Sequence, residues 1–319
     1  MKIARTALVL ASAAALASCS LGDPAPSNVD AGSLAEGAAL DGVSLTVGGK
    51  EFTEQLVLCE ITAEALESAG ASVDRSCGMS GTSSVRSALE SGDIDLYWEY
   101  TGTGWLTHLG ESKVIPDPQE LYRQLDAEDT RENGITWLEP APANNTYAVA
   151  LAKETADQLG ISTLSDYAEL ARNDSDKAGF CGAAEFFGRD DGWPGLQDAY
   201  GFDLPDGDVS ELAAGAVYNS IDKGSPCTFG EVFATDGRIS ALDLTVLRDD
   251  QHYFPVYNPS VSIDADVLEE NPDIEKVLAP LAEALDDATL QKLNAEVDVD
   301  GKTPEDVSKD WLVAEGFVS

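Results

Sequence analysis

Basic residues and histidines are scarce in this chain of 319 residues. It carries 19 Lys and Arg against 58 Asp and Glu, a formal net charge of −39 at pH 7, and its only histidines are His108 and His252. Such an acidic surface repels a phosphate backbone, which argues against nucleic acid as a partner. The charge also keeps a protein soluble at high ionic strength, so we expect a salty or alkaline surrounding.

The sequence also lacks the patterns of metal and catalytic sites. No C-x-x-C pair and no Cys/His cluster is present, so we expect no metal ion and no other cofactor. There is no G-x-S-x-G elbow, H-E-x-x-H pair or P-loop, and no G-x-G-x-x-G follows a strand. Neither histidine is flanked by a nucleophile motif. We therefore expect a protein that is not an enzyme.

The N-terminal segment has the pattern of an export signal. Lys2 and Arg5 precede an apolar run from Ala7 to Leu16, which is too short to span a bilayer. The run ends in LASC, which resembles the bacterial lipobox, in which the cysteine, here Cys19, is lipidated and becomes the mature N-terminus. The alternative is an ordinary secretory signal that is cleaved at a nearby small residue.

We therefore predict that residues 1–18 are a lipoprotein signal peptide. Residues 19–40, rich in Gly, Ala, Pro, Ser and Asp, then form a flexible tether. A lipid on Cys19 would anchor the chain to the outer face of a bacterial cell membrane.

Apolar patterning predicts an α/β protein in which strands alternate with helices, which is typical of a sheet with parallel neighbours. Thr53 is placed to cap the first helix, and the C-terminal part reads as wholly helical. The predicted strands are residues 43–47, 71–75, 94–100, 146–152, 180–184, 232–234 and 244–247, and the predicted helices are residues 54–68, 82–92, 119–133, 165–172 and 208–220.

Six motifs follow one another along the chain. They are GGKEFTEQ (48–55), DLYWEYTGTGW (95–105), NNTYAVA (144–150), GRDDGWPGL (188–196), FATDGRI (233–239) and DDQHYFPVYN (249–258). Together they resemble the signatures of the substrate-binding lipoproteins of osmoprotectant ABC importers, a family that captures glycine betaine, choline, carnitine and related quaternary ammonium compounds. The resemblance spans roughly residues 45–317 in collinear order.

The resemblance implies an α/β, two-lobed fold of the class II periplasmic-binding-protein type, with the ligand in a cleft between the lobes. Residues 41–143 and 252–319 would form lobe I, and residues 144–251 would form lobe II. The implied function is capture of a quaternary ammonium ligand and its delivery to the permease of an ABC importer by a monomeric binding protein. A structural surface lipoprotein is the remote alternative, but the repeats or β-rich pattern it predicts are missing.

A quaternary ammonium group has no N–H and cannot be neutralised, so a protein holds it by surrounding it with aromatic faces. Tyr100, Tyr147 and Tyr257 lie where strands meet loops, and α/β sheets bind ligands at such strand ends. For each alone, the alternative is a half-buried core or rim tyrosine. The resemblance implies that Tyr100 and Tyr147 form one side of a cage and that Tyr257 and Phe233 form the other, with Tyr218 as a further member.

The other end of the ligand decides which compound binds. The resemblance implies that Lys50 and Arg189 hold a ligand carboxylate and that Thr103 donates a further hydrogen bond. Gln55 and Asn145, from the same motifs, are implied as polar residues at the rim.

Two alternatives remain open at this end of the site. Arg189 could instead form an ion pair with Asp190 or Asp191, which follow it directly. Choline-specific relatives tend to carry an acid at the position of Thr103, so this threonine favours glycine betaine over choline. A choline- or carnitine-preferring protein of the same importer class is the alternative.

Four cysteines remain if Cys19 carries a lipid, and they are Cys59, Cys77, Cys181 and Cys227. An even number in an exported chain indicates two disulfide bonds, for which three connectivities exist. We favour Cys59–Cys77 with Cys181–Cys227, because each pair then stays within one predicted lobe.

Overall fold

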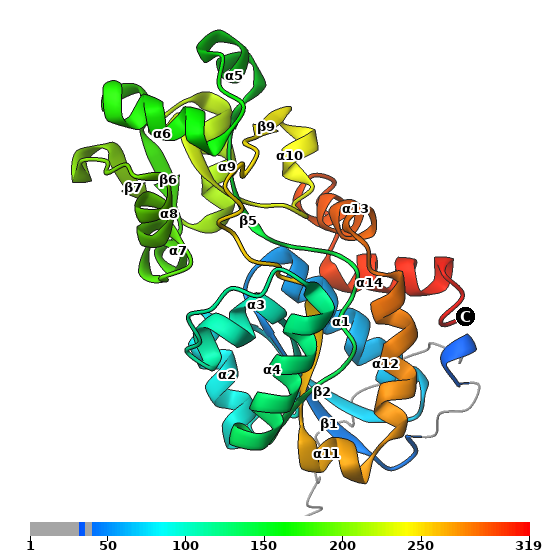
Figure 1. Ribbon diagram of the computed structural model, residues 1–319. Coiled ribbons are helices and arrows are strands. Elements are labelled where there is room, and N and C mark those ends of the chain that lie inside the picture. The colour runs from blue at the N-terminus through cyan, green and yellow to red at the C-terminus, as the bar shows by residue number, and fades with distance from the viewer. Residues whose placement is uncertain (1–31, 36–39) are drawn as a thin grey trace, which may run out of the picture.

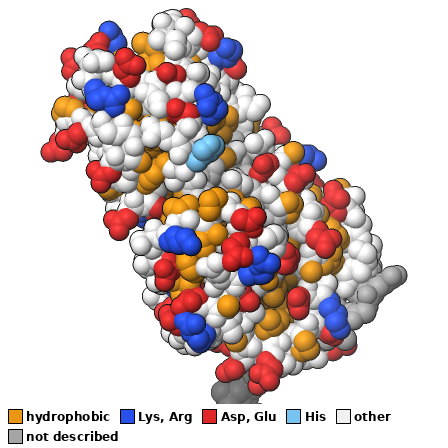
Figure 2. Space-filling view, viewed as in Figure 1, with side chains coloured by type: hydrophobic (Ala, Val, Ile, Leu, Met, Phe, Trp, Pro, Cys, Tyr) orange, Lys and Arg blue, Asp and Glu red, His pale blue; other side chains and the backbone are white. Residues whose placement is uncertain are grey.

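The structure is a computed structural model that describes residues 32–35 and 40–319. Two bulky halves, each built on a five-stranded sheet, are joined by a narrow waist (Figures 1 and 2), and this confirms the predicted α/β class. Within the described residues, we find no helix with the length and apolar character needed to cross a membrane. The predicted signal peptide, Cys19 and most of the predicted tether lie outside the described residues.

The first sheet has the strand order β2-β1-β3-β10-β4. Strand β1 is parallel to β2 and β3, as the alternating pattern predicted, whereas β10 is antiparallel to both of its neighbours. The strands are β1 (Ser44–Lys50), β2 (Ser72–Met79), β3 (Leu96–Tyr100), β4 (Ile135–Trp137) and β10 (Pro259–Asp264).

The prediction that the C-terminal part is wholly helical is wrong, because β10 lies in it. The hydroxyl of Ser260 donates to the carbonyl of Leu138 at 2.5 Å, and that of Ser262 donates to the carbonyl of Tyr97 at 3.2 Å. Both serines are fully buried. Residues 260–264 alternate polar and apolar side chains in the manner of a strand, so the prediction overlooked a signal that the sequence carries, and nearby backbone carbonyls satisfy the two serines in the core.

Helices cover both faces of the first sheet. Alternate residues of β3 face the two sides, since Leu96 and Trp98 pack with α1 and the C-terminal helices, whereas Tyr97 packs with α2 and α4. The helical elements of this half are η1 (Ser33–Ala35), α1 (Thr53–Ser68), α2 (Thr82–Ser91), α3 (Thr101–Thr103), the π-helical turn η2 (Gly104–His108), α4 (Pro118–Asn133), α11 (Ala265–Glu270), α12 (Asp273–Ala284), α13 (Asp287–Asp298) and α14 (Pro304–Ala314).

The predicted cap of α1 is wrong. Thr53 is the first helical residue, and Phe52 occupies the capping position without a side-chain bond. The Thr53 hydroxyl instead donates to Oδ1 of Asp298 on α13 at 2.7 Å. The start of α1 is therefore tied to a helix 245 residues further along the chain.

The second sheet has the order β7-β6-β8-β5-β9 and is formed by one continuous stretch of chain. Helices α6 and α8 pack on one of its faces and α9 on the other. The elements are β5 (Tyr147–Ala152), α5 (Lys153–Leu159), α6 (Leu164–Asn173), η3 (Ser175–Lys177), β6 (Phe180–Gly182), α7 (Ala184–Gly188), α8 (Trp193–Tyr200), η4 (Asp206–Asp208), β7 (Val209–Glu211), α9 (Ala214–Lys223), β8 (Phe229–Phe233), α10 (Arg238–Ala241) and β9 (Leu244–Val246).

The predicted helix over residues 208–220 is wrong in its first part. Residues Val209–Glu211 form β7, which pairs in parallel with β6 at the edge of the sheet. Helix α9 begins only at Ala214. A three-residue edge strand is too short to establish its own periodicity, and the sheet decides its conformation.

Two segments connect the sheets, residues 138–146 and residues 247–258, and they run beside each other at the waist (Figure 1). The backbone N–H of Asn145 donates to the carbonyl of Tyr257 at 3.0 Å, and the N–H of Tyr257 donates to Oδ1 of Asn144 at 2.8 Å. The side chain of Asn258 donates to the carbonyl of Ala143 at 2.7 Å. These bonds bring Asn145 and Tyr257, from two different motifs, next to each other.

Both favoured disulfides are present. Cys59 on α1 is bonded to Cys77 on β2, and Cys181 on β6 is bonded to Cys227, which precedes β8. Each bond joins elements of one sheet and the helix or loop beside it, which confirms the connectivity that the sequence favoured.

Candidate functional site

A cavity lies between the two halves and receives side chains from both. Eight of the ten residues predicted to bind ligand line it. They are Lys50, Tyr100, Thr103, Asn145, Tyr147, Arg189, Phe233 and Tyr257, and the remaining wall is formed by Glu51, Phe52, Thr82, Ala183, Glu185, Ala214 and Glu231.

Aromatic rings from both halves follow one another around this cavity. Tyr147 and Phe233 are directly paired across β5 and β8, with their ring centroids 5.5 Å apart, and Tyr257 meets Tyr147 edge-on at 5.7 Å. Phe52 stacks on Phe233 at 5.3 Å and on Tyr100 at 6.2 Å. Five rings therefore offer π faces or edges to one space, the arrangement that a group without N–H donors requires.

The structure groups these rings differently from the prediction. Tyr147, Phe233 and Tyr257 lie together, whereas Tyr100 ends β3 of the first sheet and reaches them through Phe52. Phe52 was not among the predicted residues, although it lies inside the first motif. The sequence places it between a strand and a helix, but only the docked halves show that its ring meets Phe233.

Tyr218 does not line the cavity. It lies on α9 and is 1% exposed, and its hydroxyl accepts a hydrogen bond from the backbone N–H of Phe233 at 3.0 Å. The guanidinium of Arg238 lies 4.0 Å from the centre of its ring. Tyr218 therefore supports the end of β8 behind the cage, so its predicted place in the wall is wrong.

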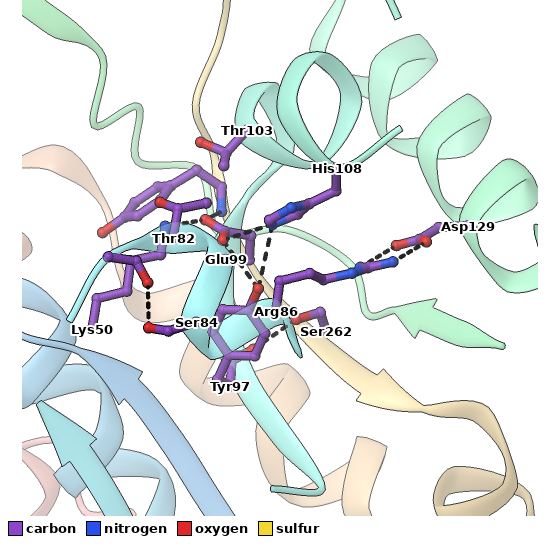
Figure 3. Close-up of polar contacts among 12 residues, drawn as sticks. Lys50, Thr82, Ser84, Arg86, Tyr97, Glu99, Thr103, His108, Asp129 and Ser262 are labelled. Carbon is purple, nitrogen blue, oxygen red and sulfur yellow. Dashed lines mark hydrogen bonds and ion pairs between the residues drawn. The ribbon is translucent and has the colours of Figure 1, made fainter. Parts of the chain in front are cut away.

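Lys50 reaches the cavity from the end of β1, and a buried acid neutralises it. Its Nζ lies 2.6 Å from Oε1 of Glu99 and 5.4 Å from the centre of the Tyr100 ring. Oε2 of Glu99 accepts from the Tyr97 hydroxyl at 3.1 Å and lies 3.1 Å from Nε2 of His108 (Figure 3).

Glu99 stays ionised despite its position inside the protein. Its burial alone would raise the pKa of the carboxyl, but the charge of Lys50 and the hydrogen bond to His108 outweigh burial and hold that pKa well below its ordinary value. The pair of Lys50 and Glu99 therefore carries no net charge, and the ammonium group is fixed in place beneath the cage.

Arg189 is also engaged in an ion pair. Its Nε and Nη2 donate to the two carboxylate oxygens of Asp191 at 2.8 and 2.5 Å, and Nη1 donates to Glu185 at 3.3 Å. The alternative partner Asp191 is thus the one that the structure shows. The guanidinium also lies 5.6 Å from the centre of the Tyr147 ring, and its Nη2 donates to the Thr103 hydroxyl at 3.4 Å, which connects the two halves.

Gln55 lies behind the wall of the cavity. Its Oε1 accepts from the backbone N–H of Lys50 at 3.3 Å, and its Nε2 donates to the Tyr100 hydroxyl at 3.3 Å. It is 1% exposed. Gln55 is therefore placed to hold two wall residues, and the prediction that it lies at the rim is wrong.

Glu54, in the first turn of α1, is a residue that the sequence did not single out for the site. Its carboxylate accepts from the Tyr100 hydroxyl and from Asn145 Nδ2, both at 2.8 Å, from Thr235 Oγ1 at 2.5 Å and from Asn294 Nδ2 at 3.0 Å. These four donors come from both halves and from the connection between them. Burial raises the pKa of Glu54, and the four hydrogen bonds act against that increase.

Contacts across the cavity also involve Thr82 and Glu185. The Thr82 hydroxyl on α2 forms a short hydrogen bond with Oε1 of Glu185 on α7. Glu185 also touches Arg189, so one acid contacts both the opposite half and the guanidinium. Among the residues that the structure describes, no group of three or more His, Cys, Asp or Glu is arranged to hold a metal ion.

Most of the chain matches a known protein family. Residues 43–314 match the model of the substrate binding domain of ABC-type glycine betaine transport systems. The chain belongs to this family. The match covers both sheets, the connections between them and all the residues that line the cavity.

Three relatives illustrate the similarity, two of them over most of their length. A glycine-betaine-binding protein of Pseudomonas aeruginosa is 38% identical over 276 residues, which cover 84% of this chain and 87% of the relative. The glycine betaine-binding protein YehZ of Escherichia coli is 33% identical over 276 residues, with 85% and 90% covered. An ergothioneine transport permease/ergothioneine binding protein, EgtU of Helicobacter pylori, is 34% identical, and the chain spans about half of it (48%).

Solved structures of the family share the fold. Apo YehZ from Escherichia coli aligns with a TM-score of 0.64 at 31% identity and covers 86% of this chain and 99% of its own. A structure described as a glycine betaine/carnitine/choline ABC transporter aligns with a TM-score of 0.70 at 25% identity, with the same coverage. The two-lobed periplasmic-binding-protein architecture that the sequence predicted is therefore confirmed, and the family is one of transport binding proteins.

Proposed function

We propose that this chain binds a quaternary ammonium osmoprotectant, glycine betaine first, between its two lobes and delivers it to the permease of an ABC importer. The observation that carries the proposal is the convergence of five aromatic rings from both lobes on one cavity, with Lys50 and Arg189 in its wall. Each desolvated cation–π contact contributes about 0.5–2 kcal/mol, so several of them support micromolar binding after the costs of association.

In this proposal the rings hold the ammonium, and Lys50, Arg189 and Thr103 hold the carboxylate. Residues 41–143 and 252–319 act as lobe I and residues 144–251 as lobe II. Closure of the lobes around the ligand produces the form that the permease recognises.

The proposal also includes a membrane anchor. Residues 1–18 would be removed, and a lipid on Cys19 would hold the monomeric protein at the outer face of the membrane.

Choline is the second candidate, and one observation favours it. Both cations in the cavity wall are already paired, Lys50 with Glu99 and Arg189 with Asp191, and Glu185 adds a further acid. A wall that is close to neutral or slightly acidic suits a cation without a carboxylate as well as it suits a zwitterion.

Calorimetric titration of the soluble form that lacks residues 1–19 tests the function, with glycine betaine and choline as the paired ligands at moderate and high salt. We expect micromolar binding of glycine betaine and weaker binding of choline. Equal binding of both ligands would agree with the aromatic cage but would contradict the proposal that Lys50 and Arg189 hold a carboxylate. If neither bound, the proposed ligand class would be wrong.

A double variant separates the carboxylate site from the cage. Arg189→Gln with Asp191→Asn removes an ion pair without changing the net charge, and so avoids leaving one buried charge alone. We expect about tenfold or greater loss of glycine betaine affinity and a much smaller change for choline. The matched control is Arg131→Gln with Glu128→Gln, a solvent-accessible ion pair on α4 that does not line the cavity. This variant should leave both affinities unchanged.

A further inference from the structure

Glu231 is a buried acid in the cavity wall that the proposed function does not use. It lies on β8 two residues before Phe233, so both side chains point to the same face of the sheet. Across the strand pair, Glu231 is opposite Val149 and Phe233 is opposite Tyr147. The carboxyl is therefore one step further along the same surface that carries two rings of the cage, and it is 4% exposed.

The hydrogen bonding of Glu231 is incomplete. Its Oε2 accepts from the backbone N–H of Ala183 at 2.7 Å. For Oε1 we find no donor among the described residues. Neither cation of the cavity pairs with it, since Lys50 is bound to Glu99 and Arg189 to Asp191. A buried carboxylate with one hydrogen bond and no counter-ion is costly, so this site favours the protonated form until a positive charge arrives.

The surroundings of the carboxyl act on its pKa in opposite directions, and burial is the largest influence. Burial raises the pKa of Glu231 to about 8; the Ala183 N–H and Arg189 oppose the increase, and Glu185 adds to it. The other titratable groups that line the cavity are Lys50, Glu51 and the hydroxyls of Tyr100, Tyr147 and Tyr257. The site therefore favours the protonated form of Glu231 in the ligand-free protein at pH 7.

We propose that Glu231 is the counter-charge of the ligand's quaternary ammonium and that it releases a proton to the solvent when the ligand binds. This inference rests on the proposed function, because it needs a permanent cation beside Tyr147 and Phe233. Such a cation cannot lose its charge, and in a site of low dielectric it stabilises the ionised form of a neighbouring carboxyl. The O–H bond of Glu231 breaks, the electron pair stays on the carboxylate, and the proton passes to the buffer.

Proton release makes binding depend on pH. The free protein binds the proton more tightly than the complex does, so affinity rises as the pH rises toward the pKa of the free protein and levels off above it. We expect the dissociation constant of choline to fall by about three- to tenfold per unit between pH 6 and 8 and to change little from pH 8.5 to 9.5. Choline is the sharper probe because its only charge is the ammonium.

Calorimetry of the mature protein with choline and with glycine betaine, at pH 7 in phosphate and in Tris, measures the protons released directly. The two buffers differ in ionisation enthalpy, so a difference in the observed enthalpy counts the protons. We expect close to one proton per choline. Binding without proton release and without a pH slope would overturn the role of Glu231 while leaving the proposed function in place. If neither ligand bound at any pH, the proposed function and this inference would fail together.

Three variants assign the proton to a residue. Glu231→Gln keeps the size and an oxygen for the Ala183 N–H, and it should bind choline with no proton release and no pH slope. Glu231→Asp retains a titratable group and should retain release. Glu211→Gln, at an exposed acid on β7 of the same sheet, is the matched control and should retain both the release and the pH slope. A Glu231→Gln protein that still released the proton would assign it elsewhere and overturn the proposal. Should Glu231→Gln not fold, the absence of release from the wild type or from Glu231→Asp would overturn it equally.

Discussion

The hydroxyl of Tyr257 donates a hydrogen bond to Oδ2 of Asp191 at 2.6 Å, and the same oxygen accepts from Nη2 of Arg189 at 2.5 Å. Tyr257 belongs to the connection between the sheets, whereas Asp191 and Arg189 follow α7 in the second half. One carboxylate thus ties a ring of the cage to the guanidinium at the other end of the site. These two hydrogen bonds therefore connect the aromatic end of the site with its polar end.

Tyr257 contributes to the site through its aromatic ring and through the hydrogen bond of its hydroxyl to Asp191, and two variants separate these contributions. Tyr257→Ala removes the ring and should weaken ligand binding by about tenfold or more, whereas Tyr257→Phe keeps the π face and loses only the bond to Asp191. We expect a loss of about threefold or less for Tyr257→Phe. Calorimetric titration measures both, with thermal unfolding as the check on folding. Unchanged affinity of Tyr257→Ala would remove this ring from the cage.

The position of the Tyr257 ring depends on the absence of a side chain at Gly102. A Cβ built there would lie 2.7 Å from Cδ1 of Tyr257 and 2.7 Å from the carbonyl oxygen of Val256. Gly102→Ala should displace the ring and lower affinity by about tenfold although no cage residue is replaced. Gly207→Ala is the matched control, because a Cβ there meets nothing within 4 Å. Wild-type affinity in Gly102→Ala would show that the ring position tolerates a shift.

Stability should fall as the pH rises, and Glu64 on α1 contributes to this fall. Burial raises the pKa of its carboxyl to about 7, Glu60 adds to the increase, and its Oε2 has no hydrogen-bond partner among the described residues. The folded protein therefore holds a proton that the unfolded chain loses near pH 4.5, so stability is lost as the pH rises from there through about 7.

Glu64→Gln removes this dependence. The variant should be more stable than the wild type by about 1–3 kcal/mol at pH 8 and should show no gain at pH 5. Urea unfolding at both pH values measures the difference. Glu283→Gln, on the exposed side of α12, serves as the control. A gain of equal size at both pH values would mean that ionisation of Glu64 is not its cause.

The two disulfides should contribute unequally to stability. Cys181–Cys227 closes a loop with a sequence separation of 46 residues and Cys59–Cys77 one of 18, and loop entropy in the unfolded chain gives about 4 and about 3 kcal/mol for them. We expect Cys181→Ala with Cys227→Ala to lower the free energy of unfolding more than Cys59→Ala with Cys77→Ala. Urea titrations with and without reductant rank the two, and the reverse order would contradict the loop-entropy account.

Local patterns in the sequence were sufficient for most elements of the fold. Apolar spacing predicts the helix from Thr53 and the strand from Ser44, although the strand continues through Gly48 and Gly49 to Lys50. Strand β10 carries the same kind of signal, because Val261 and Ile263 alternate with polar residues, and the prediction overlooked it; only the structure shows that the two serines are buried as well. The short edge strand β7 has no such signal, and its conformation depends on its pairing with β6.

The motif resemblance predicted most of the side chains that line the cavity, but not the residues with which these side chains pair. Lys50 and Glu99 are 49 residues apart, and no spacing rule indicates that they pair. The role of Glu231 is hidden for a different reason. Its sequence neighbours are those of an ordinary buried strand, and its position beside the cage follows only from the pairing of β8 with β5.

The place of β10 between β3 and β4 has a consequence for the order in which the molecule is assembled during synthesis. The second sheet draws all its strands from residues 147–246, so it can form as soon as that stretch has been made. Four of the five strands of the first sheet are made early, but the place between β3 and β4 stays empty until Pro259–Asp264 has been made. The half that begins first is therefore completed last, and during that interval its apolar faces are the part of the nascent chain most in need of protection from aggregation.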